Sequence, residues 1–409
     1  MKVWVKLLTG AFLGIIAGCF LPNNQGVTDA FLWLEGLAIG IGRYAVYPIL
    51  VFSLTIAIYE LRQDGRFWPI VLHSFLVIAG SSAFVIASGI IVTLCFPPSR
   101  ILIFFEEQAE AFSLSIADNI TDLFPSNMFS VLSGGGAYLF PVCVFAFFLG
   151  IGLSYDRNYT KPVIGIIDSL SRIFYHLASF FSEILGFVMI VLAAYWSFRF
   201  SSALAAKMFR DLIILLGVFS LILGFGILPL FLYLLKPKVN PWAVLYGSLG
   251  PAVAAFFSGD INFTFPVLQR HLKENLGIRR RSSAVTLTLF TTFGRAGSAM
   301  VAASAFIVIT KSYSSLDIAL ADILLIFFRA FVISFFLARH PGEGAYIALA
   351  VLCMGYGSVL ETGYLFLKSL AFYLTAVGAF LDVMICSLGS YAVARLNVFQ
   401  EDKNIRHFI

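Results

Sequence analysis

The chain has 409 residues, of which 60% are hydrophobic and 12% are charged, and its formal net charge is +5. Because soluble domains carry roughly 25% charged residues, this composition excludes an ordinary soluble protein and predicts an all-α polytopic membrane protein. The small net charge argues against nucleic-acid binding. The five cysteines stand singly in apolar segments, so we expect no zinc or iron–sulfur site and no cofactor.

Eight apolar runs are long enough for membrane spans, each of which needs roughly 20 residues. The first, residues 3–21, follows a basic start and also resembles a signal peptide, but its length favours a first transmembrane helix. An acidic stretch at 106–122 precedes the fourth run, which the glycines at 134–136 interrupt. The other seven runs cover residues 30–61, 66–97, 124–155, 161–198, 209–235, 282–310 and 361–396.

Positive charges alternate along the chain and predict its orientation. Lys2, Arg62, Arg157 and the arginines at 279–281 fall on one side of the membrane, and the acidic stretch falls on the other. By the positive-inside rule, this pattern places the N-terminus in the cytoplasm. We expect a multi-pass protein of the cell (cytoplasmic or inner) membrane. Arg199 lies on the opposite side and is an exception.

Two further segments, 241–276 and 317–357, have a different form. Each consists of two short apolar pieces, which meet at "FSGDINFTFP" in the first and at "ARHPGEGAY" in the second. Neither piece is long enough to span a membrane. Paired short segments broken by Gly and Pro indicate a transporter binding site, so we predict two re-entrant helical hairpins.

Arg295 lies in "TTFGRAGSAM", inside the apolar run 282–310. An arginine at bilayer depth costs at least ~2.5 kcal/mol on insertion scales and therefore requires a partner. Asp382 and Asp260 are the two acidic candidates, and the sequence leaves the choice between them open. Gly294 and Gly297 flank Arg295, which predicts that the helix is broken there.

Several stretches resemble those of the glutamate transporter family, the dicarboxylate/amino acid:cation symporters. They are "YPILVFSL", "LFPSNMFSVLSGGG" followed by "FAFFLGIGL", and "HPGEGA", in the family's order. The resemblance implies eight transmembrane helices, two re-entrant hairpins and a homotrimer in the lipid bilayer. It also implies an elevator mechanism, in which a transport part (66–97 and 209–396) slides along a scaffold (1–65 and 124–208).

The first hairpin departs from the family pattern. Relatives have a serine-rich tip ahead of Thr-x-Pro; here Thr264 and Pro266 remain, but Asp260, Ile261 and Asn262 replace the serines.

The broken helix departs as well. The family's Asn-Met-Asp-Gly-Thr, whose aspartate and carbonyls hold sodium, reads Gly294, Arg295, Ala296, Gly297 and Ser298 here. The sodium-binding carboxylate is therefore absent, and no metal site is expected.

The last helix allows two alignments with the family. The preferred one puts Asp382 at an asparagine position, Cys386 at a sodium aspartate and Gly378 at the arginine that grips acidic solutes. The other makes Asp382 the amine-binding aspartate and puts Ile385 at the arginine. Residues expected around the solute are Asp260, Asn262, Thr264, Arg295, Ser298, Arg339, Gly342, Glu343, Gly344, Asp382 and Cys386.

These departures lead to a hypothesis about coupling. The guanidinium of Arg295, which does not lose its proton in proteins, replaces bound sodium as the counter-charge. The chain would then be a symporter for a small amino acid or dicarboxylate that needs no sodium, either coupled to protons through Asp260, Glu343 or Asp382 or uncoupled. Na+ and H+ both stay open as coupling ions. In the competing assignment, Arg295 or Arg339 binds a carboxylate of the solute.

Other interpretations remain. Arg295 could form a purely structural ion pair, and Asn262, Thr264 and Ser298 could only cap half-helices. An intramembrane enzyme with Asp260 and Asp382 as its carboxylate pair lacks the expected motifs, so we predict no enzyme. A passive channel or a paralogue without transport activity is the third class.

Overall fold

A computed structural model of the chain describes residues 2–20, 25–101, 121, 123–125, 127–133, 138–205, 207–235, 240–313, 318–356 and 360–401. Within these residues every regular element is a helix, apart from one isolated bridge between Ile278 and Gln400. The acidic residues predicted between 106 and 122 and the glycines at 134–136 lie outside the described residues.

The first four helices follow the predicted runs with one difference. The run 30–61 is two helices, because the chain turns at Tyr44 and Ala45 before Pro48. Proline has no N–H to donate and is best tolerated in the first turn of a helix, which is where Pro48 stands. The helices are α1 (Val3–Cys19), α2 (Gln25–Arg43), α3 (Val46–Gln63) and α4 (Phe67–Cys95).

The middle of the chain contains one very long helix. α7 (Arg157–Ala205) has 49 residues, which at 1.5 Å per residue makes it roughly 70 Å long. Such a helix must tilt strongly or extend beyond a bilayer core of about 30 Å. It is preceded by α6 (Phe140–Leu153) and followed by α8 (Arg210–Ile222) and α9 (Leu228–Leu235).

The C-terminal half contains the predicted helix breaks. The run 282–310 is α12 (Arg280–Phe293) and α13 (Ala296–Tyr313), interrupted at Gly294 and Arg295. Each of the two segments predicted as hairpins, 241–276 and 317–357, contains a pair of helices joined by a tip. We call residues 259–264 the first tip and residues 335–343 the second tip. The pairs are α10 (Pro241–Ser258) with α11 (Phe265–Glu274), and α14 (Leu320–Ser334) with α15 (Gly344–Met354). α16 (Ala371–Leu396) ends the fold.

Six helical stretches in the described part of the chain are long and apolar enough to cross a membrane. α1, α6 and α15 are apolar but shorter. The structure therefore supports an all-helical membrane protein, while eight spans, re-entrant hairpins and the division into scaffold and transport parts stay predictions.

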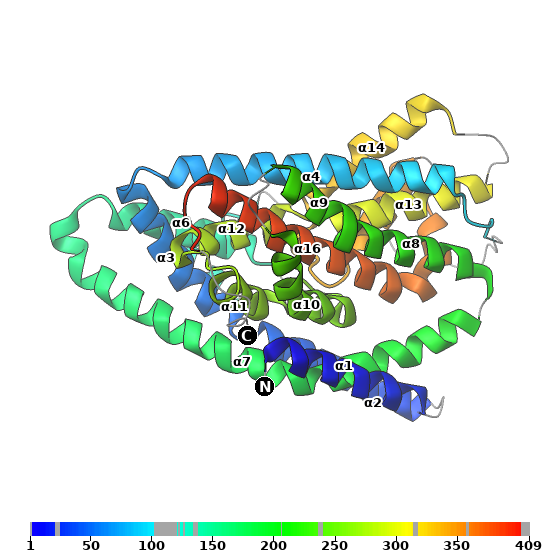
Figure 1. Cartoon of the computed structure of the whole chain (residues 1–409), viewed down its shortest axis with the longest axis horizontal. Helices are drawn as coiled ribbons and strands as arrows, with labels where there is room; N and C mark the ends of the chain where they lie inside the picture. The colour runs from blue at the N-terminus through cyan, green and yellow to red at the C-terminus, as the bar shows by residue number, and fades with distance from the viewer. Residues whose placement is uncertain are drawn as a thin grey trace.

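The helices form two packed groups (Figure 1). The first group is α7, which lies along one side of the molecule, with α1 and α2 packed against it. α4 lies along the opposite side. The second group lies between α7 and α4 and forms the most buried part of the protein. It consists of α12, α13, α15 and α16, which pack together. α10 contacts both α1 and α16, so the first tip lies between the two groups.

Candidate functional site

The two tips and the broken helix meet at one point. The backbone N–H of Ile261 in the first tip donates to the carbonyl of Pro341 in the second tip, at 3.4 Å. A Cβ on Gly344, which begins α15, would lie 2.5 Å from Nη2 of Arg295. Segments that are far apart in sequence therefore enclose the guanidinium.

Arg295 forms a fully buried ion pair with Asp382 of α16. Its Nε donates to Oδ2 of Asp382 at 2.8 Å, and the two side chains are 1% and 0% exposed. Nη2 of Arg295 also donates to the Pro341 carbonyl at 3.2 Å and lies 3.5 Å from the Ser298 hydroxyl. The alternative pairing of Arg295 with Asp260 is not formed.

The start of α13 holds the Asp382 carboxylate from the other side. The N–H groups of Gly297 and Ser298 donate to Oδ1 at 2.7 and 3.1 Å, and the Ser298 hydroxyl donates to Oδ2 at 2.6 Å. These N–H groups have no partner within the helix, and the helix dipole favours an anion there. Each carboxylate oxygen thus accepts two hydrogen bonds, which is what a buried carboxylate requires.

One nitrogen of Arg295 remains without a partner. Nη1 is buried and donates no hydrogen bond to any described residue. Burying an unpaired donor usually costs about 1–3 kcal/mol, so such atoms often bind a ligand or a water molecule. Ala296, the next residue along the chain, is completely buried and provides no carboxylate. The described residues contain no group of three or more His, Cys, Asp or Glu side chains that could hold a metal ion.

A second ion pair connects α2 to the first tip. Nε of Arg43 donates to Oδ2 of Asp260 at 2.6 Å, and a second guanidinium nitrogen contacts the same oxygen. Oδ1 of Asp260 accepts the N–H groups of Asn262 and Phe263 at 2.7 and 3.3 Å, which fixes the turn of the tip. Asp260 is completely buried, whereas Arg43 is 22% exposed.

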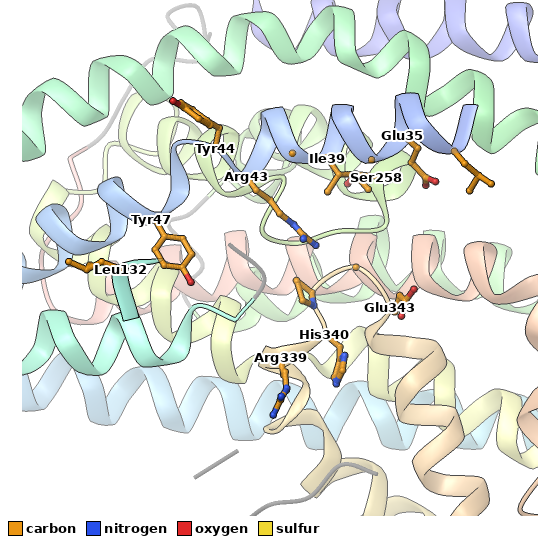
Figure 2. Close-up of a pocket in the computed structure, with 15 residues that line it drawn as sticks. Glu35, Ile39, Arg43, Tyr44, Tyr47, Leu132, Ser258, Arg339, His340 and Glu343 are labelled. Carbon is orange, nitrogen blue, oxygen red and sulfur yellow. The ribbon is translucent and has the colours of Figure 1, made fainter. Parts of the chain in front are cut away.

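Arg43 faces a large cavity between α2 and the second tip (Figure 2). This cavity has a volume of about 810 Å³, and Glu35, Arg339, His340 and Glu343 also line it. Asp382 and Arg295 do not reach it, because the second tip and the start of α15 cover them.

Nine of the predicted site residues fall into three groups. Arg295, Ser298, Gly344 and Asp382 surround the buried ion pair, and Cys386 lies one turn beyond Asp382 on α16. Asp260 and Gly342 meet at the second ion pair, where a Cβ on Gly342 would lie 3.5 Å from Nη2 of Arg43. Arg339 and Glu343 line the cavity.

Two further predicted residues, Thr264 and Asn262, lie in the turn of the first tip. The Thr264 hydroxyl donates to the Ile261 carbonyl at 2.7 Å, as expected of a residue that shapes a turn. Asn262 is buried in the same tip and contacts Asp260 through its backbone N–H.

Sequence reasoning missed Arg43 and Glu35. Both are charged residues within the apolar run 30–61, and the rule that marked Arg295 as functional applies to them equally. Arg199, which appeared only as an exception to the charge pattern, lies 4.8 Å from the Phe372 ring centre and lines a second cavity.

Comparison with known proteins adds the family. The sequence model of the sodium:dicarboxylate symporter family matches residues 3–398. The chain is also similar to the proton/sodium-glutamate symport protein of Bacillus subtilis (strain 168), with 20% identity over 360 residues, covering 85% of this chain and 82% of that protein. Together with the apolar helices, the match over nearly the whole length shows that this chain belongs to the sodium:dicarboxylate symporter family, and that it is a membrane transporter and not an enzyme.

Proposed function

We propose that this chain is a secondary active transporter that moves a small amino acid or dicarboxylate across the cytoplasmic membrane without needing sodium. In this proposal it has eight transmembrane helices, two re-entrant hairpins and a cytoplasmic N-terminus, and it forms a homotrimer. Family membership supports transport, and the name of the Bacillus relative supports a solute of this class and either protons or sodium as the coupling ion.

The Arg295–Asp382 pair is the observation that carries the proposal on coupling. In this family a bound cation would balance the negative charge at the helix break. Here the break contains Arg295, whose guanidinium contacts Asp382 at 2.8 Å, and Ala296 provides no carboxylate. Binding of a metal cation beside a fixed guanidinium would be opposed by repulsion in a region of low dielectric constant. The chain would therefore couple transport to protons or move its solute without coupling.

The packing of the helices supports an elevator mechanism. The group around α7 and the group around α16 are each densely packed, and the first tip lies between them. Solute can reach the buried ion pair only if the second tip moves, because Pro341 and Gly344 cover the guanidinium. In this proposal the second tip opens to admit solute, and the transport part then slides along α2 and α7.

A second candidate role for Arg295 is direct binding of solute. Its Nη1 atom is buried without a partner, and a carboxylate matches a guanidinium through two parallel hydrogen bonds. In that case the solute carboxylate would accept hydrogen bonds from Arg295 in addition to the one that Asp382 accepts.

Uptake into proteoliposomes tests both roles. Labelled amino acids and dicarboxylates are supplied while sodium and proton gradients are imposed separately, and we expect uptake that a sodium gradient does not increase. Uptake that rises steeply with the sodium gradient would contradict the counter-charge role. Absence of uptake for every solute would contradict transport itself, and equilibration of solute without accumulation under either ion gradient would indicate an uncoupled carrier or a channel.

Two variants at the helix break separate the roles. If Arg295 is only a counter-charge, Arg295→Lys keeps sodium-independent uptake, whereas Arg295→Met combined with Ala296→Asp becomes sodium-dependent. If Arg295 binds a carboxylate of the solute, Arg295→Lys loses affinity for acidic solutes, because lysine has no planar pair of donors. Arg172→Gln, which changes a 69% exposed arginine on α7, is the matched control.

A further inference from the structure

The cavity between α2 and the second tip is separate from the buried ion pair. It has a volume of about 810 Å³, whereas Arg295 and Asp382 are 1% and 0% exposed. Ligand pockets of small molecules typically have volumes of roughly 300–1,000 Å³. The cavity is therefore large enough to hold a small solute before any tip moves.

The charged side chains in this cavity are sorted by sign. Glu35 of α2 and Glu343 of the second tip lie near one end, and Arg43 and Arg339 lie toward the other (Figure 2). Neither glutamate forms an ion pair with a described residue; the charge of Arg199, which lines the second cavity, attracts Glu35, and the charge of Glu343 repels it. One end of the cavity thus favours a cation, and the other favours an anion.

Arg43 is held in place for binding an anion. Its contacts with Asp260 fix the guanidinium, and Asp260 is its only hydrogen-bond partner among the described residues. With 22% of its side chain exposed, it still presents part of the guanidinium to the cavity. A donor that is already fixed loses little conformational entropy when it binds a carboxylate.

A second cavity with a volume of about 420 Å³ adjoins the first. Both are lined by Leu32, Glu35, Ser258, Gly342 and Glu343. The second cavity is also lined by six aromatic side chains and by the cations Arg199 and Lys368. The aromatic residues are Tyr195, Trp196, Phe256, Phe257, Tyr346 and Phe372. An aromatic side chain could bury its faces and edges against these rings.

We propose that the two cavities form an outer binding site for a zwitterionic amino acid with an aromatic side chain. Glu35 and Glu343 bind the ammonium group, Arg43 and Arg339 bind the carboxylate, and the rings around Trp196 receive the side chain. This inference rests on the proposed transport function and narrows its solute from a small amino acid or dicarboxylate to an aromatic amino acid. Solute binds to this outer site first and reaches Arg295 afterwards.

Equilibrium binding to the full-length protein in lipid nanodiscs tests the site. The probes are L-phenylalanine, its amide, which lacks the carboxylate, and N-acetyl-L-phenylalanine, which lacks the ammonium group. We expect calorimetric titration to detect binding of L-phenylalanine and at least about tenfold weaker binding of both derivatives, because each loses a charged hydrogen-bonded contact.

Variants of residues that line the two cavities locate the bound molecule. Glu343→Gln and Arg339→Gln leave both buried ion pairs intact, and each should weaken L-phenylalanine binding by at least about tenfold. Trp196→Leu should weaken it without changing the discrimination between the derivatives. Glu361→Gln, an exposed glutamate outside both cavities, is the control and should bind as the unaltered protein does.

The outcomes distinguish failure of the outer site from failure of the transport proposal. Arg295→Met should still bind L-phenylalanine, since Arg295 lies outside both cavities. The outer site would be overturned if L-phenylalanine does not bind, if its amide binds equally well, or if Glu343→Gln and Arg339→Gln have no effect. Uptake of another solute into proteoliposomes under any of these results would leave the transport function standing.

Discussion

Arg43 of α2 and Asp260 of the first tip form an ion pair whose acidic partner is completely buried and whose basic partner reaches a cavity. The pair joins the two groups of helices. In an elevator mechanism it must break, or move as a unit, whenever the first tip slides past α2. Opening it without a replacement would leave the Asp260 carboxylate buried with only two backbone N–H donors.

We expect Arg43→Gln to lower stability more than Asp260→Asn does. Removing the arginine leaves a buried unpaired carboxylate, which costs about 3–5 kcal/mol. An asparagine at 260 can still accept the N–H of Asn262, and Arg43 can turn toward the cavity. Thermal unfolding of the solubilised protein measures the difference. Arg172→Gln, which removes an exposed ion pair with Asp168, should cost at most about 1 kcal/mol, and an equal effect of Arg43→Gln would refute the argument.

The buried Arg295–Asp382 pair predicts a non-additive result. Arg295→Met and Asp382→Asn should each destabilise the protein by about 3–5 kcal/mol, because each leaves one buried charge without its partner. The double variant removes both charges and should lose clearly less stability than the sum of the single losses. Apparent midpoints of thermal unfolding for all four proteins complete the cycle. Additive losses would mean that the two side chains are not coupled.

The sequence predicted where a helix is interrupted better than it predicted which charged residues form ion pairs with each other. Gly294, Arg295 and Gly297 interrupt an apolar run, and this local pattern is sufficient to place the break between α12 and α13. The choice between Asp382 and Asp260 as the partner of Arg295 depends on how distant helices pack, and no local pattern contains that information. Arg43 itself could have been marked by the local rule for a charge within an apolar run, but its partner, 217 positions away, could not.

Close packing at the helix break predicts that Gly297 tolerates no side chain. A Cβ there would collide with Cβ of Leu381 and lie 2.8 Å from the carbonyl oxygen of Gly378, and this backbone cannot move aside cheaply. Gly297→Ala should therefore cost about 1–3 kcal/mol and displace Asp382 from the start of α13. Gly80→Ala in α4 is the control, because a Cβ at Gly80 meets nothing within 4 Å and alanine favours a helix by up to about 1 kcal/mol. Equal unfolding midpoints for the two variants would show that the contact is not tight.

The contact between the tips predicts that a cross-link stops transport. The N–H of Ile261 lies 3.4 Å from the Pro341 oxygen, and backbone bond lengths then limit the separation of the two Cα atoms to roughly 7 Å, close to the reach of a disulfide. In a background that replaces the exposed Cys19 and Cys95 with serine, Ile261→Cys with Pro341→Cys should take up solute when reduced and lose uptake when oxidised. Each single cysteine variant controls for the substitution itself. Mass spectrometry verifies the disulfide in the oxidised protein. If the oxidised protein transports solute as fast as the reduced protein does, solute enters without separation of the tips, and the second tip does not control access to Arg295 and Asp382.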